Sequence, residues 1–101
     1  MMNKSKTKAP QLKETCSGHS GRINCVCFSN DDQTVLSGSE DGTMQIWQIK
    51  SDSGAIFRYV GHKGPITSLD INKNNSLIAT GSTDTSIRLW KPQKFWFFAF
   101  F

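Results

Sequence analysis

The sequence has no long apolar run, because its longest uninterrupted hydrophobic stretch is the seven residues 95–101. A helix that crosses a membrane needs about 20 apolar residues, so no spanning helix is predicted. Residues 1–8 carry lysines with no apolar stretch behind them, which is unlike a secretory signal. We therefore expect an intracellular protein, cytoplasmic or nuclear, that is not secreted.

Cysteine is scarce as well, with three in the chain. An odd number makes a poor disulfide framework, and Cys25 and Cys27 stand near the limit of disulfide reach if they share a strand. A metal site would use Cys16, His19, Cys25 and Cys27, but this spacing lacks the paired Cys-x-x-Cys knuckles of structural zinc. We expect free thiols, no metal ion and no cofactor.

Sequence patterns that mark nucleotide and acyl-transfer sites are missing. There is no Gly-x-x-x-x-Gly-Lys to hold a phosphate and no Gly-x-Ser-x-Gly to present a nucleophile. With 101 residues, of which 37% are hydrophobic, the chain is at most one small domain and not a multidomain enzyme. We expect no catalytic activity and no small-molecule substrate.

The positive charge is concentrated at one end. Residues 1–15 carry +3 of the net charge of +4, and the remainder is nearly neutral. Such a tail could bind nucleic acid or an anionic membrane, which is the alternative function that we consider. Because its four lysines are scattered and have no aromatic residues between them, the pattern favours a solvated, disordered tail and no nucleic-acid partner.

The sequence repeats itself at an offset of 43 residues, so that Gly18-His19 recurs as Gly61-His62. The same offset relates Ile23 to Ile66, Val35 to Ile78, Gly38-Ser39 to Gly81-Ser82, Asp41 to Asp84 and Trp47 to Trp90. One register kept over most of residues 18–91 indicates an array of structural repeats.

Each repeat has the alternating pattern of short strands bounded by turn residues. In the first repeat we expect strands around residues 25–28, 34–38, 43–49 and 55–60, with an Asp-Gly hairpin at Asp41-Gly42. Thr85 stands where the first repeat has Gly42, which predicts either a costly positive φ or another turn type. One period thus predicts four antiparallel strands and no helix.

The segments GH, LSGSEDGTMQIW, a second GH and IATGSTDTSIRLW resemble two consecutive WD40 repeats. The resemblance implies an all-β fold in which each repeat forms a four-stranded antiparallel blade of a β-propeller, and a scaffold function in binding other proteins. The residues after the two tryptophans, Gln48 and Lys91, depart from the Trp-Asp pair that names the family.

The resemblance also assigns roles to residues that look catalytic. His19, Ser37 and Asp41, and likewise His62, Thr80 and Asp84, could be read as hydrolytic triads. The family resemblance instead implies two buried hydrogen-bonded tetrads, in which an indole N–H, a hydroxyl, an imidazole and a carboxylate follow one another. The tetrads are His19, Ser37, Asp41 and Trp47 in the first repeat and His62, Thr80, Asp84 and Trp90 in the second.

The repeat pattern divides the chain into four parts. We predict a basic disordered tail at 1–15, a first repeat at 16–60, a second repeat without its outer strand at 61–91, and an aromatic tail foreign to the repeat at 92–101. The last part is read as an unselected tail, an interfacial segment on a membrane or another chain, or an improvised outer strand.

Two repeats are fewer than the three or more that such arrays usually need. The chain is therefore read as a fragment or truncated isoform of a longer propeller protein, as a self-assembling unit, or as blades added to a partner. Three copies would give six blades and four would give eight. Residues 12–16 fall where the register places the outer strand of a preceding blade, so they could complete the second blade of a neighbouring copy.

Overall fold

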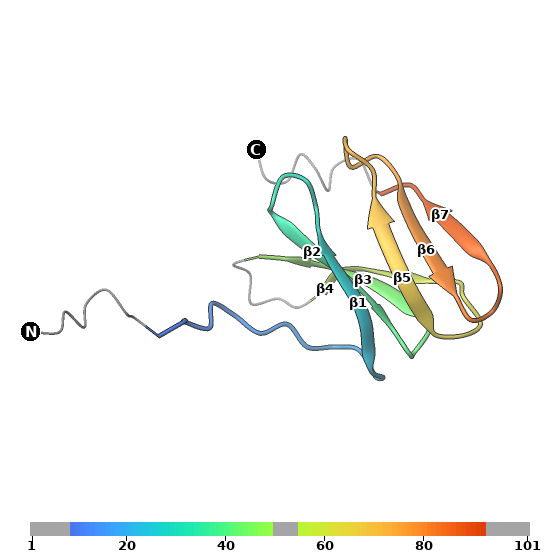
Figure 1. The fold of residues 1–101 in the computed structure, drawn as a ribbon, viewed down its shortest axis with the longest axis horizontal. Helices are drawn as coiled ribbons and strands as arrows, with labels where there is room; N and C mark the ends of the chain where they lie inside the picture. Colours follow the sequence, from blue (N-terminus) through green and yellow to red (C-terminus); the bar gives the residue numbers. More distant parts are fainter. Residues whose placement is uncertain (1–8, 50–54, 93–101) are drawn as a thin grey trace, which may run out of the picture.

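The computed structural model describes residues 9–49 and 55–92, and within them the chain is all β. Two antiparallel sheets lie side by side, and within each sheet consecutive strands are paired (Figure 1). The first sheet consists of β1 (Ile23–Phe28), β2 (Thr34–Ser39), β3 (Thr43–Gln48) and β4 (Ala55–Val60). The second consists of β5 (Ile66–Ile71), β6 (Ile78–Ser82) and β7 (Ile87–Trp90).

This architecture confirms the predicted fold of two propeller blades with a shorter second one. Within the described residues the second sheet ends at β7, where the first sheet continues to β4. Of the aromatic tail predicted at 92–101, residues 93–101 lie outside the described residues, as do residues 1–8 of the basic tail. No helix in the described part of the chain has the length and apolar character needed to cross a membrane.

The two sheets share the same irregularities at equivalent positions. The register shifts between Ile23 and Cys25 in the first sheet and between Ile66 and Ser68 in the second. The hairpins are alike too, since Gly42 has φ 83° and Thr85, at the same position, has φ 75°. Thr85 therefore keeps the left-handed turn rather than adopting another turn type, although a β-branched residue is strained there.

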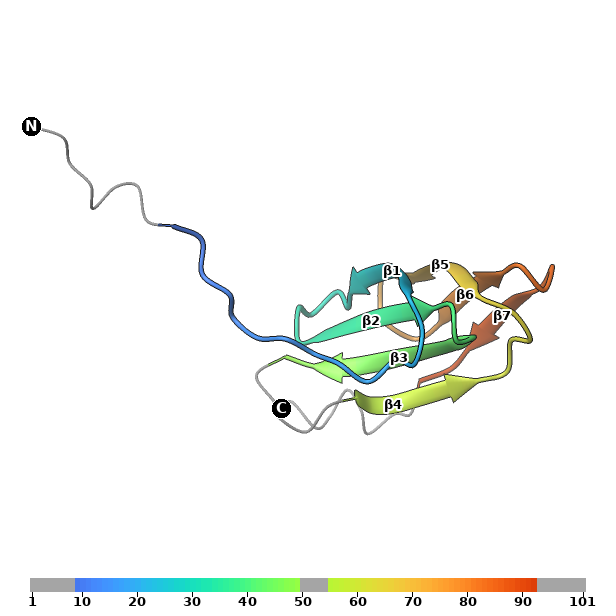
Figure 2. The same cartoon turned by 90° about the horizontal axis from the view of Figure 1, so that it is seen from below.

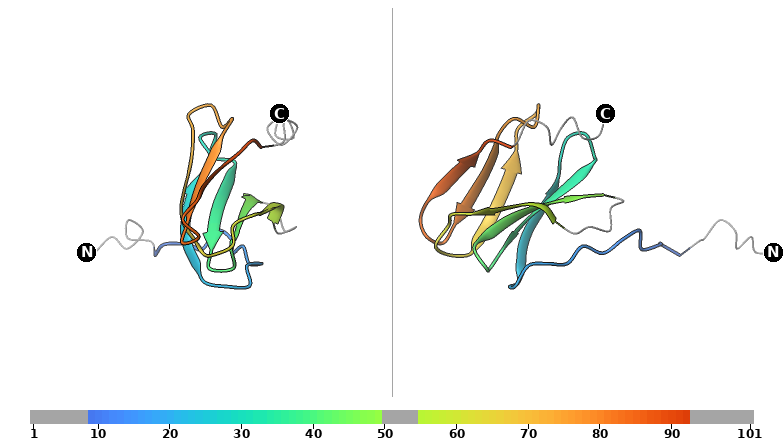
Figure 3. Two further views of the ribbon diagram at one scale, coloured as in Figure 1. Left: turned by 90° about the vertical axis from the view of Figure 1, so that its right-hand side faces the viewer. Right: turned by 180° about the vertical axis from the view of Figure 1, so that it is seen from behind.

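The core lies between the two sheets, where β5 packs against β1 and β2 (Figures 1 and 3). It consists of Leu36, Met44 and Ile46 from the first sheet and Ile66 and Ile78 from the second, all fully buried. The sheets approach closely because position 38 is glycine. A Cβ atom there would lie 2.5 Å from Cγ2 of Ile66.

Each sheet thus has an inner face toward its neighbour and an outer face away from it. Strand alternation places Val26, Phe28, Val35 and Trp47 on the outer face of the first sheet. It places Ser68, Asp70, Ala79, Gly81, Ile87 and Leu89 on the outer face of the second. The chain before β1 runs past β2 and β3 along the outer face of the first sheet (Figure 2).

Candidate functional site

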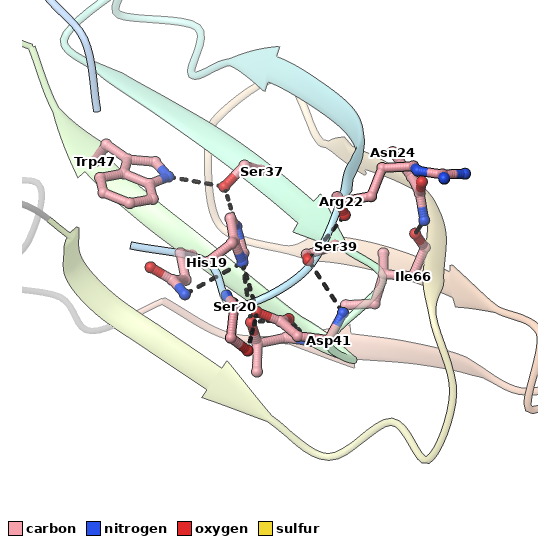
Figure 4. A network of polar contacts seen from close by, with 11 residues as sticks. His19, Ser20, Arg22, Asn24, Ser37, Ser39, Asp41, Trp47 and Ile66 are labelled. Carbon is pink, nitrogen blue, oxygen red and sulfur yellow. Dashed lines mark hydrogen bonds and ion pairs between the residues drawn. The ribbon is translucent and has the colours of Figure 1, made fainter. Parts of the chain in front are cut away.

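The first tetrad joins a loop and two strands on the outer face of the first sheet (Figure 4). The Trp47 indole Nε1 donates to the Ser37 hydroxyl at 2.7 Å, and Ser37 Oγ lies 2.6 Å from Nε2 of His19. His19 Nδ1 lies 3.1 Å from Oδ2 of Asp41. The four side chains that the sequence singled out in the first repeat are therefore brought together in the expected order.

The second tetrad has nearly the same geometry. Trp90 Nε1 donates to the Thr80 hydroxyl at 2.9 Å, and Thr80 Oγ1 lies 2.7 Å from Nε2 of His62. His62 Nδ1 lies 2.9 Å from Oδ2 of Asp84. Threonine replaces serine here without lengthening the chain of contacts by more than a few tenths of an ångström.

One arrangement of hydrogens satisfies every member of a tetrad. The indole N–H donates to the hydroxyl oxygen, the hydroxyl donates to Nε2 of histidine, and Nδ1–H donates to the carboxylate. Both imidazoles are almost completely buried, with side chains 2% exposed for His19 and none for His62. A buried polar group without a partner costs about 1–3 kcal/mol, so these continuous chains of donors and acceptors stabilise the fold.

Asp41 is held by contacts that the sequence analysis missed. Thr43 donates to Oδ1 through its hydroxyl at 2.5 Å and its backbone N–H at 2.8 Å, and the Ser20 N–H donates to Oδ2. Burial acts to raise the pKa of Asp41, but these bonds and that from His19 outweigh it and hold the pKa well below its usual range. The carboxylate thus stays ionised.

Asp84 repeats this arrangement with Ser86 in the place of Thr43. The Ser86 hydroxyl donates at 2.6 Å and has the largest effect on the carboxyl group. Against burial, it and the N–H groups of Lys63 and Ser86, with His62, hold the pKa of Asp84 well below its usual range. The signal was in the sequence, because a hydroxyl residue follows each aspartate by two positions, a spacing typical of turns that aspartate nucleates.

The hydroxyl groups are poorly placed for nucleophilic catalysis. Ser37 Oγ accepts from Trp47 and donates to His19, and the residue is 2% exposed. Thr80 has the same two partners in its tetrad and is 1% exposed. A nucleophile has to reach its substrate, and these oxygens are buried and already hydrogen-bonded to an indole N–H and an imidazole of the same tetrad.

The cysteines are free thiols, and their environment disfavours the thiolate. Burial, followed by the nearby charges of Asp70 and Cys25, raises the pKa of Cys27 to about 11. Burial also raises the pKa values of Cys25 and Cys16. Residues 9–49 and 55–92 contain no group of three or more His, Cys, Asp or Glu side chains that could hold a metal ion.

Polar side chains also link the two sheets. Asn24 Nδ2 donates to the Ile66 carbonyl at 2.9 Å (Figure 4). At the other end of β1, Asn30 donates from its backbone N–H and its amide to Oδ1 of Asn75, each at 3.0 Å. The repeat pattern did not predict these contacts, because the two asparagines are not repeated: Asn24 and Asn30 correspond to Thr67 and Lys73 in the second repeat.

Comparison with protein families finds one match. The model described as "WD domain, G-beta repeat" matches residues 10–48 and 54–91, which is more than half of the chain. The two matched segments contain both tetrads and all of the strands β1 to β7.

Curated proteins also match this chain over short stretches. Serine-threonine kinase receptor-associated protein of Homo sapiens is 54% identical over 35 residues, which are 35% of this chain and 10% of that protein. Target of rapamycin complex subunit LST8 of Saccharomyces cerevisiae is 33% identical over 48 residues, 48% of this chain and 16% of that protein. The chain therefore spans only about a tenth to a sixth of these relatives.

Proposed function

Because the chain belongs to the WD40 repeat family, we propose that it serves as a non-enzymatic scaffold on which other proteins assemble. The names of the relatives support this role. They include a subunit of the target of rapamycin complex and a receptor-associated protein.

The observation that carries the non-enzymatic part is the saturation of the tetrads. Every imidazole nitrogen and hydroxyl in them is engaged within the chain, and the carboxylates are held by backbone N–H groups. The residues with the appearance of a catalytic triad thus fasten the loop before β1 or β5 to the strands of the same sheet. We propose that their role is structural in both repeats.

The exposed outer faces support a larger propeller around these two blades. Val26 is 64% exposed and Phe28 62% on the outer face of the first sheet, while Ile87 is 77% exposed on that of the second. Repeats of this kind bury such side chains against the next repeat. We propose that the chain works within a closed ring of blades, with further blades supplied by additional repeats or chains.

His19→Ala tests the structural role of the tetrads. We expect a free energy of unfolding lower by about 1–3 kcal/mol, because Ser37 and Asp41 each lose a partner. Hydrolysis of an activated ester should stay at the buffer rate for the wild type and the variant alike. Ester hydrolysis that disappears in Ser37→Ala while the melting temperature is unchanged would contradict the proposal.

A further inference from the structure

We propose that the outer face of the second sheet docks onto the outer face of the first sheet in another copy of this chain, so that copies join head to tail into a closed propeller. The inference rests on the proposed function, since it assumes that the chain works within a closed ring of blades. The contact within the chain is its template. In that contact, the inner face of the first sheet packs on the inner face of the second. Replacing each residue by its equivalent in the other repeat gives the residues that would meet between the outer faces of two copies.

The first argument is a side chain and the space that receives it. Within the chain, Ile66 reaches over Gly38, where no Cβ atom stands in its way. The second sheet keeps a glycine at the equivalent position, Gly81, beside a hollow of about 210 Å³ on its outer face. Ile23 is the counterpart of Ile66 and is 49% exposed. A second copy would therefore insert Ile23 into the hollow beside Gly81.

The second argument is the apolar character of both outer faces. Leu69 and Ile71 pack on the core between the sheets, and their counterparts on the first sheet, Val26 and Phe28, are more than 60% exposed. On the second sheet, Ile87 and Leu89 are the counterparts of the buried Met44 and Ile46 and are 77% and 67% exposed. Burying these side chains drives association.

The third argument is electrostatic and favours a second copy over an unrelated blade. Within the chain, Asn30 donates two hydrogen bonds to Asn75 across the sheets. The counterparts of these residues are Lys73 and Asp32, both exposed. Asp32 has φ 59° and Asn75 has φ 61°, so the two turns present their side chains alike. Docking between copies would place the ammonium group of Lys73 beside the Asp32 carboxylate.

The segment before β1 supplies the fourth strand of this arrangement. Tyr59 of β4 packs edge-on against Trp90 with ring centroids 5.2 Å apart. Its counterpart Cys16, together with Trp47, lines a hollow of about 390 Å³ on the outer face of the first sheet. In a docked pair, residues 12–17 would therefore lie beside β7 of the other copy, as β4 lies beside β3.

Because the contact joins two different faces, it repeats around a ring until the ring closes. Three copies would give six blades and four would give eight, both within the usual range for propellers. Each copy then contributes the residues that complete its neighbour's outer face. Within residues 9–49 and 55–92 of one copy, no further sheet covers either outer face.

Size-exclusion chromatography with light scattering of the full chain tests the docking, with Lys73→Glu as the disrupting variant. We expect a discrete trimer or tetramer for the wild type. Lys73→Glu sets two acidic groups against each other and should raise the dissociation constant of each contact roughly tenfold. Lys63→Glu has the same change of charge on a loop away from the outer faces and should assemble like the wild type.

Two further variants make the test specific. Asp32→Asn combined with Lys73→Asn rebuilds between copies the amide pair of Asn30 and Asn75 and should retain the oligomer. Ile87→Cys places a thiol opposite Cys16 of the next copy, by analogy with the pairing of Met44 and Tyr59. Mild oxidation with oxidised glutathione should then give covalent oligomers, which are lost when Cys16→Ser is added.

A folded monomer at all concentrations, or an oligomer that Lys73→Glu leaves intact, would overturn the docking. Near-UV circular dichroism of the tryptophans shows whether such a monomer is folded. A folded monomer would leave the scaffold proposal in place. The scaffold proposal is contradicted by ester hydrolysis that depends on Ser37, not by the oligomeric state. Lys73→Glu weakening the oligomer together with the Cys16 cross-link would support the docking.

Discussion

Ile46 and Leu89 occupy the same position in the two repeats, yet Ile46 is fully buried and Leu89 is 67% exposed. Met44 and Ile87 differ in the same way, at 0% and 77%. All four side chains are large and apolar. The strands that carry them, β3 and β7, pair in the same register with the strand before them. The difference comes from the neighbouring sheet: the second sheet covers Met44 and Ile46, whereas no further sheet in the described part of the chain covers Ile87 and Leu89.

The tetrads show the opposite behaviour, because they are alike in both sheets. The contact from histidine Nε2 to the hydroxyl is 2.6 Å in the first and 2.7 Å in the second. All members of a tetrad come from one sheet and the loop that precedes it. A tetrad is therefore a property of one repeat, whereas the burial of apolar side chains is a property of two adjacent repeats.

The largest expected difference between the sheets is in the cost of truncating equivalent apolar side chains. Ile46→Ala should lower the free energy of unfolding by about 2–4 kcal/mol, because it opens a cavity in the core. Leu89→Ala should change it by about 0.5 kcal/mol or less in the monomer. Urea denaturation at low protein concentration measures both. Equal losses would show that burial does not depend on the neighbouring sheet.

Removal of the hydroxyl group should instead lower the free energy of unfolding by the same amount in both tetrads. Ser37→Ala and Thr80→Ala each leave an indole N–H and an imidazole nitrogen without a partner, at a cost of about 1–3 kcal/mol. Ser37→Thr is the matched control, because threonine already makes these contacts in the second tetrad. Thermal unfolding followed by tryptophan fluorescence checks the three variants. A loss confined to one sheet would contradict the equivalence of the tetrads.

Substitutions at the two hairpin turns should change the free energy of unfolding in opposite directions. Thr85→Gly should stabilise the chain by about 1 kcal/mol, because glycine adopts the positive φ of this turn without strain. Gly42→Ala should destabilise it by a similar amount, since its Cβ would also lie 3.2 Å from the His62 carbonyl oxygen. Chemical denaturation compares the two. A destabilised Thr85→Gly variant would argue against strain at this turn.

The two carboxylates predict a pH dependence of stability that is smallest near neutral pH and appears in acid. Their pKa values are lowered in the folded chain, so the folded state binds protons less readily than the unfolded one. The resulting stabilisation is complete above the ordinary value of about 3.9 and is lost as the pH falls below it. Melting temperatures from pH 7 to pH 2 should show this fall, and Asp41→Asn with Asp84→Asn should flatten it.

Much of the fold follows from short-range patterns that are visible in the sequence. The 43-residue offset, the alternation around Val26 and the Asp-Gly turn predicted the strands of the first sheet, and the structure has them within a few residues. The offset also drew attention to the tetrad residues, because side chains at fixed spacing on neighbouring strands meet in any blade. Thr43 and Ser86 were overlooked although they obey the same offset.

The sequence by itself determined the strands, the order in which they pair and the residues available to each tetrad, since these depend on contacts within one repeat. Tertiary structure decided what covers each face. It buried Leu36 and left its counterpart Ala79 partly open, and it placed Asn30 against Asn75. These features depend on contacts between sheets, which a pattern along one chain does not encode locally.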